Sequence, residues 1–190
     1  MTNKIHQTLQ HPNKLLSRPG KKITAIDQAS IEKMYKTLAA QENCAALAAT
    51  QLGVELRMTV INHAIAIDKL ISCKDLSGND VSFIDEAIVK PICLINPKII
   101  DRSEEMLNEI EGCMSVGNNI RERVKRNKRV KCQFLTENGQ ELIIEAEGFF
   151  SRCIQHELDH LDGLLFIDRL SPLKRKMVDL KFFKRSKKKV

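Results

Sequence analysis

The chain has 190 residues, of which 43% are hydrophobic and 29% are charged. This length favours one domain with a single core, and this composition excludes an intrinsically disordered protein. The net charge of +7 is concentrated near the end of the chain, because residues 173–190 carry nine Lys or Arg residues and one acid, Asp179. We therefore expect a basic tail rather than a wholly basic surface.

The sequence carries no signal for export or membrane insertion. Its apolar runs end well before the ~18 residues that a membrane helix requires, and residues 1–14 lack the apolar stretch of a secretory signal. We expect a protein without a membrane span that works in the cytoplasm, with an organelle as the less favoured location. In such a reducing compartment the six cysteines are expected to be buried side chains, metal ligands or nucleophiles rather than disulfides.

The first half of the chain predicts a helix followed by strands. Asp27 can cap a helix over residues 28–41. The apolar face of this helix would consist of Ile31, Met34, Tyr35 and Leu38. Residues 57–62 and 88–100 are expected to be strands, and Pro91 and Pro97 in the second favour a sheet edge or a β-bulge. Residues 63–87 between them predict a loop or an elaborated hairpin.

The second half predicts a hairpin followed by two helices. Residues 129–136 and 140–148 form the expected hairpin. A helix should follow Gly148 and end near Gly163, and a last helix should begin at Ser171-Pro172. The expected strands lie mostly in the middle of the chain, and the expected helices lie toward both of its ends. The fold class is therefore α+β, with antiparallel or mixed strands packed around a central helix that carries the HELDH segment, and with a C-terminal helix.

A metal-binding pattern lies on the predicted central helix, where residues 156–160 match H-E-x-x-H. Residues four apart share one helix face at roughly 6 Å, so His156 and His160 can converge on one ion, and Glu157 is placed to move the protons of a water molecule. The alternative is a solvated face that carries two His and two acids. The flanks are apolar, which argues for burial, and buried His and Glu side chains are costly without an ion or a partner.

A catalytic ion needs a third protein ligand. The metallopeptidases that share H-E-x-x-H take it from a His or Glu further along, but Phe166 occupies the expected His position and no Glu, His or Cys follows His160. The ligand must then lie upstream, unless a downstream aspartate serves. These aspartates are Asp162, Asp168 and Asp179. Upstream, Cys113 stands out because it follows a glycine and precedes a Gly-Asn-Asn turn, and its alternative role is that of a buried structural thiol.

Three segments together resemble the motifs of the peptide deformylases. E-G-C-x-S at residues 111–115 and Q-H-E-x-D-H-L at residues 155–161 resemble the second and third motifs of that family. C-A-A-L-A-A-T-Q at residues 44–51 resembles the first, G-x-G-x-A-A-x-Q. Further likeness is found at His11-Pro12, at LINPKI (94–99) and at GLLFIDRL (163–170). The resemblance covers about residues 5–170.

This resemblance implies a hydrolase that removes the N-formyl group from the N-terminal methionine of newly synthesised polypeptides and releases formate. It implies one divalent metal ion, natively Fe(II), for which Zn, Ni or Co can substitute. The ligands would be Cys113, His156 and His160, with a water as the fourth. A thiolate ligand is softer than a third imidazole, which suits a labile Fe(II) site and makes oxidation the expected route of inactivation.

The resemblance also assigns roles around the ion. Glu157 would take the proton of the water and give it to the leaving amine. The side-chain amide of Gln51 and the backbone N–H of Met114 would donate to the developing oxyanion. The substrate-binding residues are expected to be Ala45, Ala46, Glu111, Gly112, Phe149 and Cys153. We expect residues 1–170 to form the catalytic domain, and residues 171–190 to form a basic C-terminal helix or tail that is not a separate domain.

The first motif departs from the family pattern, because Cys44 and Ala46 replace its two glycines. In the family this strand pairs with the substrate backbone, so glycine permits a close approach. Both replacements are acceptable where φ is negative. The proline that usually follows the second motif is also absent from residues 115–118. A divergent member with an intact metal site and weak or altered activity is therefore an alternative.

Two further alternatives remain at this point. One is a metallopeptidase with an unusual cysteine ligand, and the other is an RNA-binding or ribosome-binding protein whose metal is structural. The basic tail itself has three interpretations: a solvated end, an attachment to an anionic membrane through Phe182 and Phe183, or docking to ribosomal RNA through phosphate contacts. The resemblance favours the third, because bacterial deformylases bind the ribosome with this helix.

Overall fold

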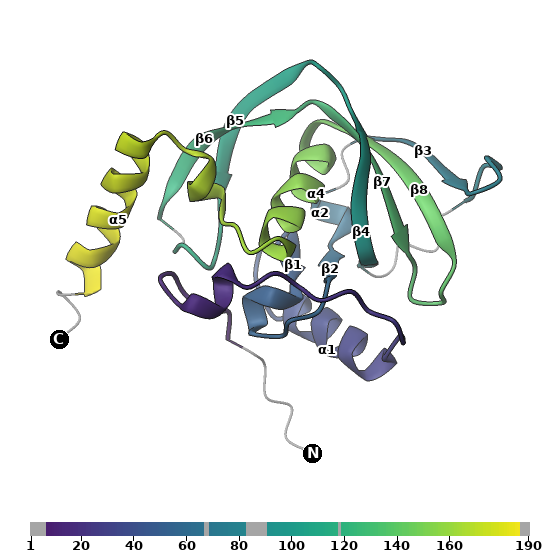
Figure 1. Ribbon diagram of the computed structural model, residues 1–190, viewed down its shortest axis with the longest axis horizontal. Helices are drawn as coiled ribbons and strands as arrows, with labels where there is room; N and C mark the ends of the chain where they lie inside the picture. The colour runs from purple at the N-terminus through teal and green to yellow at the C-terminus, as the bar shows by residue number, and fades with distance from the viewer. Residues whose placement is uncertain (1–6, 67–68, 83–90, 118, 187–190) are drawn as a thin grey trace.

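The α+β class is confirmed by the computed structural model, which describes residues 7–66, 69–82, 91–117 and 119–186 (Figure 1). Within these residues, six strands form one antiparallel sheet and two form a separate ribbon. In spatial order the sheet contains β1 (Ala46–Ala48), β2 (Met58–Ile61), β4 (Ile92–Arg102), β7 (Arg129–Leu135), β8 (Glu141–Glu147) and β3 (Lys69–Asp75). The ribbon pairs β5 (Met106–Gly112) with β6 (Arg121–Asn127). The helices are η1 (Lys14–Ser17), α1 (Gln28–Ala39), η2 (Ala49–Leu52), α2 (His63–Ala66), α4 (Gly148–Leu161), η3 (Phe166–Arg169) and α5 (Pro172–Ser186).

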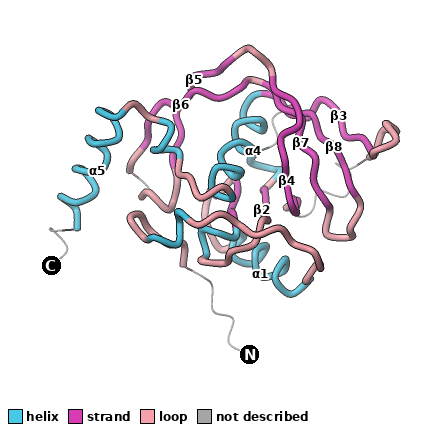
Figure 2. The backbone as a smooth tube through the Cα atoms, in the orientation of Figure 1, coloured by secondary structure: helices cyan, strands magenta, loops and turns pink. Residues whose placement is uncertain are grey.

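Helix α4 lies at the centre, and the strands arch around it (Figure 2). Phe150, Ile154 and Leu158 on α4 pack into the main core, together with the inward side chains of β7 and β8. Those inward side chains are Val130, Cys132, Phe134, Leu142, Ile144 and Ala146. They alternate with less buried residues along each strand, as a half-buried antiparallel sheet requires. Because α4 is enclosed, its polar side chains are buried too and must find partners.

Helix α1 covers the opposite face of the sheet at β1, β2 and β4. Ile31, Met34 and Leu38 on α1 pack with Met58 and Val60 of β2 in a second cluster. The alternate side chains of β2 point toward α4: Ile61 joins the main core, and the Thr59 hydroxyl reaches a residue of α4. Strand β2 therefore lies between the two helices and is buried along its whole length.

Several predicted elements are confirmed close to their expected bounds. Asp27 caps α1 by accepting from the backbone N–H groups of Ala29 and Ser30. The expected hairpin is β7 and β8, and the last helix begins at Pro172. Helix α4 ends before Gly163, which adopts φ +77°. A Cβ on this glycine would also lie 2.7 Å from the carbonyl oxygen of Ser17, so both the backbone conformation and the close approach require glycine.

Two expectations gave alternatives between which the structure decides. Strand β4 lies inside the sheet, between β2 and β7, so the sheet edge expected from Pro91 and Pro97 is wrong. The bulge is confirmed, because pairing with β7 skips from Ile95 to Lys98 and the chain accommodates Pro97 there. Within residues 63–87, the structure favours the elaborated hairpin over the loop: the seven-residue edge strand β3 pairs with β8, and the chain then turns at Gly78 so that Lys74 forms an antiparallel bridge with Asp80. Residues 67–68 and 83–87 lie outside the described residues.

Helix α5 leaves the body of the molecule but remains attached along one face (Figure 1). Val178 is 1% exposed and belongs to the third cluster, which also contains Cys113 and Phe166. Phe182 packs against the same cluster and meets the ring of His11 edge-on at 5.5 Å, so it faces the protein rather than solvent. Among the residues described, none of the helices combines the length and apolarity that crossing a membrane requires.

The packing around α4 predicts unequal effects for two neighbouring substitutions on β8. Ile144→Ala removes a side chain that is fully buried against the main core, and the resulting cavity should lower the free energy of unfolding by about 2–5 kcal/mol. Ile143→Ala, on the other face of the same strand, should cost clearly less. Urea unfolding of both variants measures the difference, and equal losses would contradict the packing described.

Candidate metal centre

Helix α4 presents its two histidines to one point in space. His156 and His160 lie one turn apart, with ring centroids separated by 5.0 Å and planes at 78°. The carbonyl oxygen of His160 accepts a hydrogen bond at 2.9 Å from the hydroxyl of Thr50, which ties this end of α4 to η2. The ring of His156 stacks on Phe166 at 6.1 Å. The first contact fixes the backbone at His160, and the second restrains the imidazole of His156.

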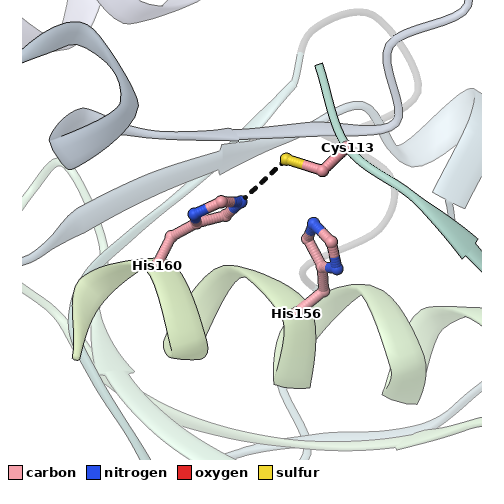
Figure 3. A group of neighbouring side chains, drawn as sticks. All are labelled: Cys113, His156 and His160. Carbon is pink, nitrogen blue, oxygen red and sulfur yellow. Dashed lines mark hydrogen bonds between the residues drawn. The ribbon is translucent and has the colours of Figure 1, made fainter. Parts of the chain in front are cut away.

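Cys113 enters from the ribbon, immediately after β5 ends at Gly112. Its carbonyl oxygen accepts from the backbone N–H groups of Val116 and Gly117, both at 3.0 Å. This tight turn aims the thiol at α4, and Figure 3 shows the sulfur facing the two rings. The cysteine therefore comes from a segment far away in sequence and completes the group that H-E-x-x-H begins.

The three side chains fit a single metal ion. One ligand atom of each of Cys113, His156 and His160 lies within 4.8 Å of the others. The Cys113 Sγ and His160 Nε2 atoms are 3.2 Å apart, near the separation of about 3.5 Å expected for sulfur and nitrogen ligands on one tetrahedral ion. One thiolate and two imidazoles form a donor set typical of Zn or a late transition metal with one position left open.

A buried charge network supports the ligands from behind. Nδ1 of His156 bonds to the carboxylate of Glu111 at 2.9 Å, which leaves Nε2 for the ion. Glu111 also accepts from Arg126 Nε and Nη2 at 2.9 and 3.0 Å. Arg126 donates its remaining Nη1 to Asp159 at 2.5 Å, and Arg169 donates to the same carboxylate. The guanidinium of Arg126, 4% exposed, thus connects β5, β6 and α4.

These contacts shift the pKa values of the cluster in opposite directions. Burial raises the pKa of the Cys113 thiol, but the neighbouring imidazoles outweigh it and hold this pKa well below its ordinary value. Burial lowers the pKa of His156, but its bonds to Cys113 and Glu111 raise it well above the ordinary range. Burial raises the pKa of Glu111, and the bonds from His156 and Arg126 outweigh this and lower it to about 2. Cys113 is therefore a thiolate, the form that binds metals.

Glu157 lies beside the ligands in a different environment. It is 3% exposed, and the hydroxyl of Thr59 lies 3.3 Å from its Oε2. Burial raises the pKa of Glu157 above its ordinary value, and the two imidazoles oppose this only in part. A carboxylate with a raised pKa is a better proton acceptor near neutral pH. Thr59 was not predicted, although its place between Met58 and Val60 on a buried strand is a signal for an inward polar side chain.

The amide of Gln51 is oriented by two contacts. Its Oε1 accepts from the backbone N–H of Ala48 at 2.9 Å, so the amino group must point the other way, toward the ligands. Nε2 donates to Ser115 Oγ at 3.1 Å and approaches Cys113 Sγ at 3.5 Å. The amide is thus a fixed hydrogen-bond donor at the sulfur ligand.

A cavity of about 610 Å³ opens beside the cluster. Its walls are the β1 region, the junction of β5 and β6, and the first half of α4. All of the predicted catalytic and substrate-binding residues line it, namely Gln51, Met114, Glu157, Ala45, Ala46, Glu111, Gly112, Phe149 and Cys153. His160 does not line this cavity and is the most deeply buried of the three candidate ligands. Glu111 differs from the other substrate candidates, because Arg126 and His156 engage both of its oxygens.

Cys44 also lines the cavity, and its thiol donates to the carbonyl oxygen of Ala46 at 3.1 Å. The carbonyl of Ala45 accepts from Asn62 on the β2 side. Since successive carbonyls along a strand point in opposite directions, the carbonyl of Ala46 faces the free edge of β1. Burial, followed by the charge of Glu157, raises the pKa of Cys44 to about 12, so the thiol keeps its proton.

Arg126 and Asp159 were missed as functional residues. The available signal for Arg126 was its register, because it lies two residues after Val124, and the alternate residues of a half-buried strand share one face. Val124 and Arg126 are the two buried residues of β6. Asp159 occupies a variable position of H-E-x-x-H, where the pattern alone assigns no role.

The network predicts that Arg126 is needed for stability and for metal retention. Arg126→Met would leave two carboxylates, Glu111 and Asp159, with fewer buried partners, and breaking a buried ion pair in this way costs about 3–5 kcal/mol. Arg123→Met is the matched control on the same strand, where the side chain is exposed. Urea unfolding and metal content per chain measure both effects. A variant with wild-type stability and full metal content would contradict the role given to Arg126.

Comparison with known proteins agrees with this geometry. A family model described as polypeptide deformylase matches residues 5–176. Peptide deformylase 1 of Coxiella burnetii is 40% identical over 178 residues, which cover 92% of this chain and 93% of that protein. The crystal structure of peptide deformylase from Ehrlichia chaffeensis matches with a TM-score of 0.79 at 34% identity, covering 98% of this chain and 99% of that one. Its complex with actinonin matches with a TM-score of 0.78 at 34% identity, covering 96% and 98%.

The family match spans most of the chain, and the similar structures cover nearly all of it. The buried thiolate, the two histidines on α4 and the cavity beside them lie within the matched residues. The chain therefore belongs to the peptide deformylase family.

Proposed function

We propose that this protein is a metal-dependent hydrolase that removes the N-formyl group from the N-terminal methionine of newly synthesised polypeptides and releases formate. The observation that carries the proposal is the shared position of Cys113, His156, His160 and Glu157 at one cavity of a deformylase-family chain. The catalytic unit would be residues 1–170, with residues 171–190 as an attached helix rather than a separate domain.

The proposed cofactor is one divalent ion, natively Fe(II), with Zn, Ni or Co as substitutes. A soft thiolate beside two imidazoles favours such a late transition metal over Mg²⁺ or Ca²⁺. When bound, the ion would lower the pKa of a water molecule toward neutrality and polarise the formyl carbonyl. Metal analysis of protein purified without oxygen identifies the native ion, and a Ca²⁺-loaded or Mg²⁺-loaded protein would contradict the assignment.

Glu157 is the proposed acid and base. It would take the proton of the attacking water, keep it during the tetrahedral stage, and pass it to the amine of the departing methionine. Its burial and its raised pKa support the first half of this role, because they make the carboxylate accept a proton more readily. Thr59 would steer the carboxylate through the contact at 3.3 Å.

The oxyanion would form near Cys113. Gln51 is the proposed side-chain donor, supported by the fixed orientation of its amide toward the sulfur. The backbone N–H of Met114, the residue after this ligand, is the proposed second donor. Glu111 would act through His156 by holding that ring in place, rather than by touching the substrate. Ala45, Ala46, Gly112, Phe149 and Cys153 would bind the methionyl peptide.

The proposed location is the cytoplasm of a bacterial cell, with the ribosome as a partner through α5. Lys176 and Lys181 are exposed on this helix, and basic side chains can bind RNA phosphates regardless of sequence. Immunofluorescence or fractionation of the producing cell tests the location. An exclusively organellar or exported protein would contradict it.

The role of Glu157 can be tested by a conservative substitution. Glu157→Gln should lower kcat for formate release from formyl-Met peptides by roughly 10²–10⁴-fold, because proton transfer is lost while the ligands remain. Metal content should not change. Glu109→Gln, an exposed acid on β5, is the control and should behave as wild type.

The same assay separates the alternatives to deformylation. Cleavage of internal peptide bonds would favour a metallopeptidase, and a metal-loaded protein that turns over neither substrate would favour a structural metal or a divergent member with altered activity. Full formate release by Glu157→Gln would reject the assigned acid and base.

The ribosome proposal is best tested by charge reversal. Deleting α5 would remove Val178, which belongs to the same buried cluster as Cys113, and would therefore confuse docking with folding. Lys176→Glu combined with Lys181→Glu should instead weaken ribosome binding severalfold at moderate salt and flatten its salt dependence. Small-peptide turnover should remain. Lys33→Glu with Lys36→Glu, exposed on α1, is the control pair. Unchanged ribosome binding by the α5 variant would reject the proposal.

A further inference from the structure

Two arginines that line the cavity have no counter-ion among the residues described. Arg121 at the start of β6 and Arg152 on α4 both contribute to the cavity wall. The ion pairs among the described residues engage Glu111 through Arg126 and His156, and none of them includes Arg121 or Arg152. The acids that line the cavity are placed differently: Glu111 is neutralised by Arg126, Glu157 lies beside the metal ligands, and Glu42 is exposed in the segment before β1.

Arg152 is held at a defined distance from the reaction centre. It lies one helical turn before His156, so the two side chains share a face of α4 at roughly 6 Å. Its guanidinium carbon lies 4.9 Å from the centre of the Phe149 ring, a cation–π contact that restrains an otherwise flexible side chain. The positive charge of Arg152 is therefore held over the Phe149 ring, about one helical turn away from His156.

Arg121 approaches the same cavity from the ribbon. It pairs directly with Gly112 across β5 and β6. A Cβ on Gly112 would lie 3.3 Å from Cγ of Arg121, so the absence of a side chain lets the arginine stem lie against the backbone next to Cys113. Two walls of the cavity thus each carry an unpaired guanidinium, and a guanidinium matches a carboxylate with two parallel hydrogen bonds.

We infer that Arg152 and Arg121 select substrates that carry an acidic side chain one or two residues after the formylated methionine. The inference rests on the proposed deformylase function. An extended peptide advances about 3.3 Å per residue, so a chain whose formyl group lies at the ligands brings its next side chains level with the turn of α4 that holds Arg152. A lysine at these positions would meet two like charges, whereas aspartate would be paired.

Peptide pairs that differ in one charge test this selection. The substrates are formyl-Met-Xaa-Ala amides and formyl-Met-Ala-Xaa amides with Xaa as Asp, Ala or Lys; the terminal amide removes a competing carboxylate. At low salt, kcat/KM for the better Asp peptide should exceed that for its Lys counterpart by roughly tenfold, and high salt should reduce this ratio. Arg152→Gln should lower the ratio to roughly threefold, and the double variant with Arg121→Gln should bring it near one.

Arg123→Gln is the matched control, because it removes the same charge from the same strand outside the cavity, and it should keep the wild-type ratio. Turnover of the Ala peptides without any preference for Asp over Lys overturns the inference and leaves the proposed function intact. A preference that survives in the double variant also overturns it. Absence of formate release from every peptide overturns the proposed function and the inference together.

Discussion

The buried guanidinium of Arg126 is the interaction on which the site depends. It joins β6 to Glu111 at the end of β5 and to Asp159 on α4, so the strand that precedes Cys113 and the helix that carries both histidines are bound to one group. Glu111 then bonds to His156 and sets which nitrogen faces the ion. A buried ion pair adds little net stability compared with apolar packing. Its contribution here is position: it places ligands from two distant segments at one point.

The charged side chains of the cluster also alternate in sign from one neighbour to the next. The thiolate of Cys113 lies beside the imidazoles, His156 beside Glu111, Glu111 beside Arg126, and Arg126 beside Asp159. Each charge is buried next to an opposite one, which offsets the cost of removing it from water. In the absence of an ion the proton on His156 balances the thiolate. A divalent cation held by the same side chains would take over that balancing role.

Local patterns predicted the elements whose stability is local, and missed those that depend on distant partners. Helix α4 and its histidines follow from spacing on one helix, and the β7–β8 hairpin follows from a short turn. The pairing of β3 with β8 was not predicted because β8 lies about seventy residues later. The β5–β6 ribbon was missed because its exposed, charged strands lack a clear alternation. Cys113 stood out upstream because of its glycine and the following turn, but no local spacing connects it with His156, so the family motif was needed to favour the ligand role over a structural thiol.

The two replaced glycines of the first motif change the hydrogen bonding at the edge of β1 more than they change the conformation of its backbone. Cys44 and Ala46 stand where the family motif has glycine, and β1 still forms, because the backbone there needs no positive φ among the residues described. The added thiol instead donates to the carbonyl oxygen of Ala46 on the free edge of the strand. A peptide that pairs with β1 must therefore share or displace this bond. Because a thiol is a weak donor, a backbone N–H can displace it, whereas a hydroxyl at the same place would compete more strongly. The cysteine is thus compatible with an edge that accepts a substrate strand, although it makes this acceptor less open than glycine would.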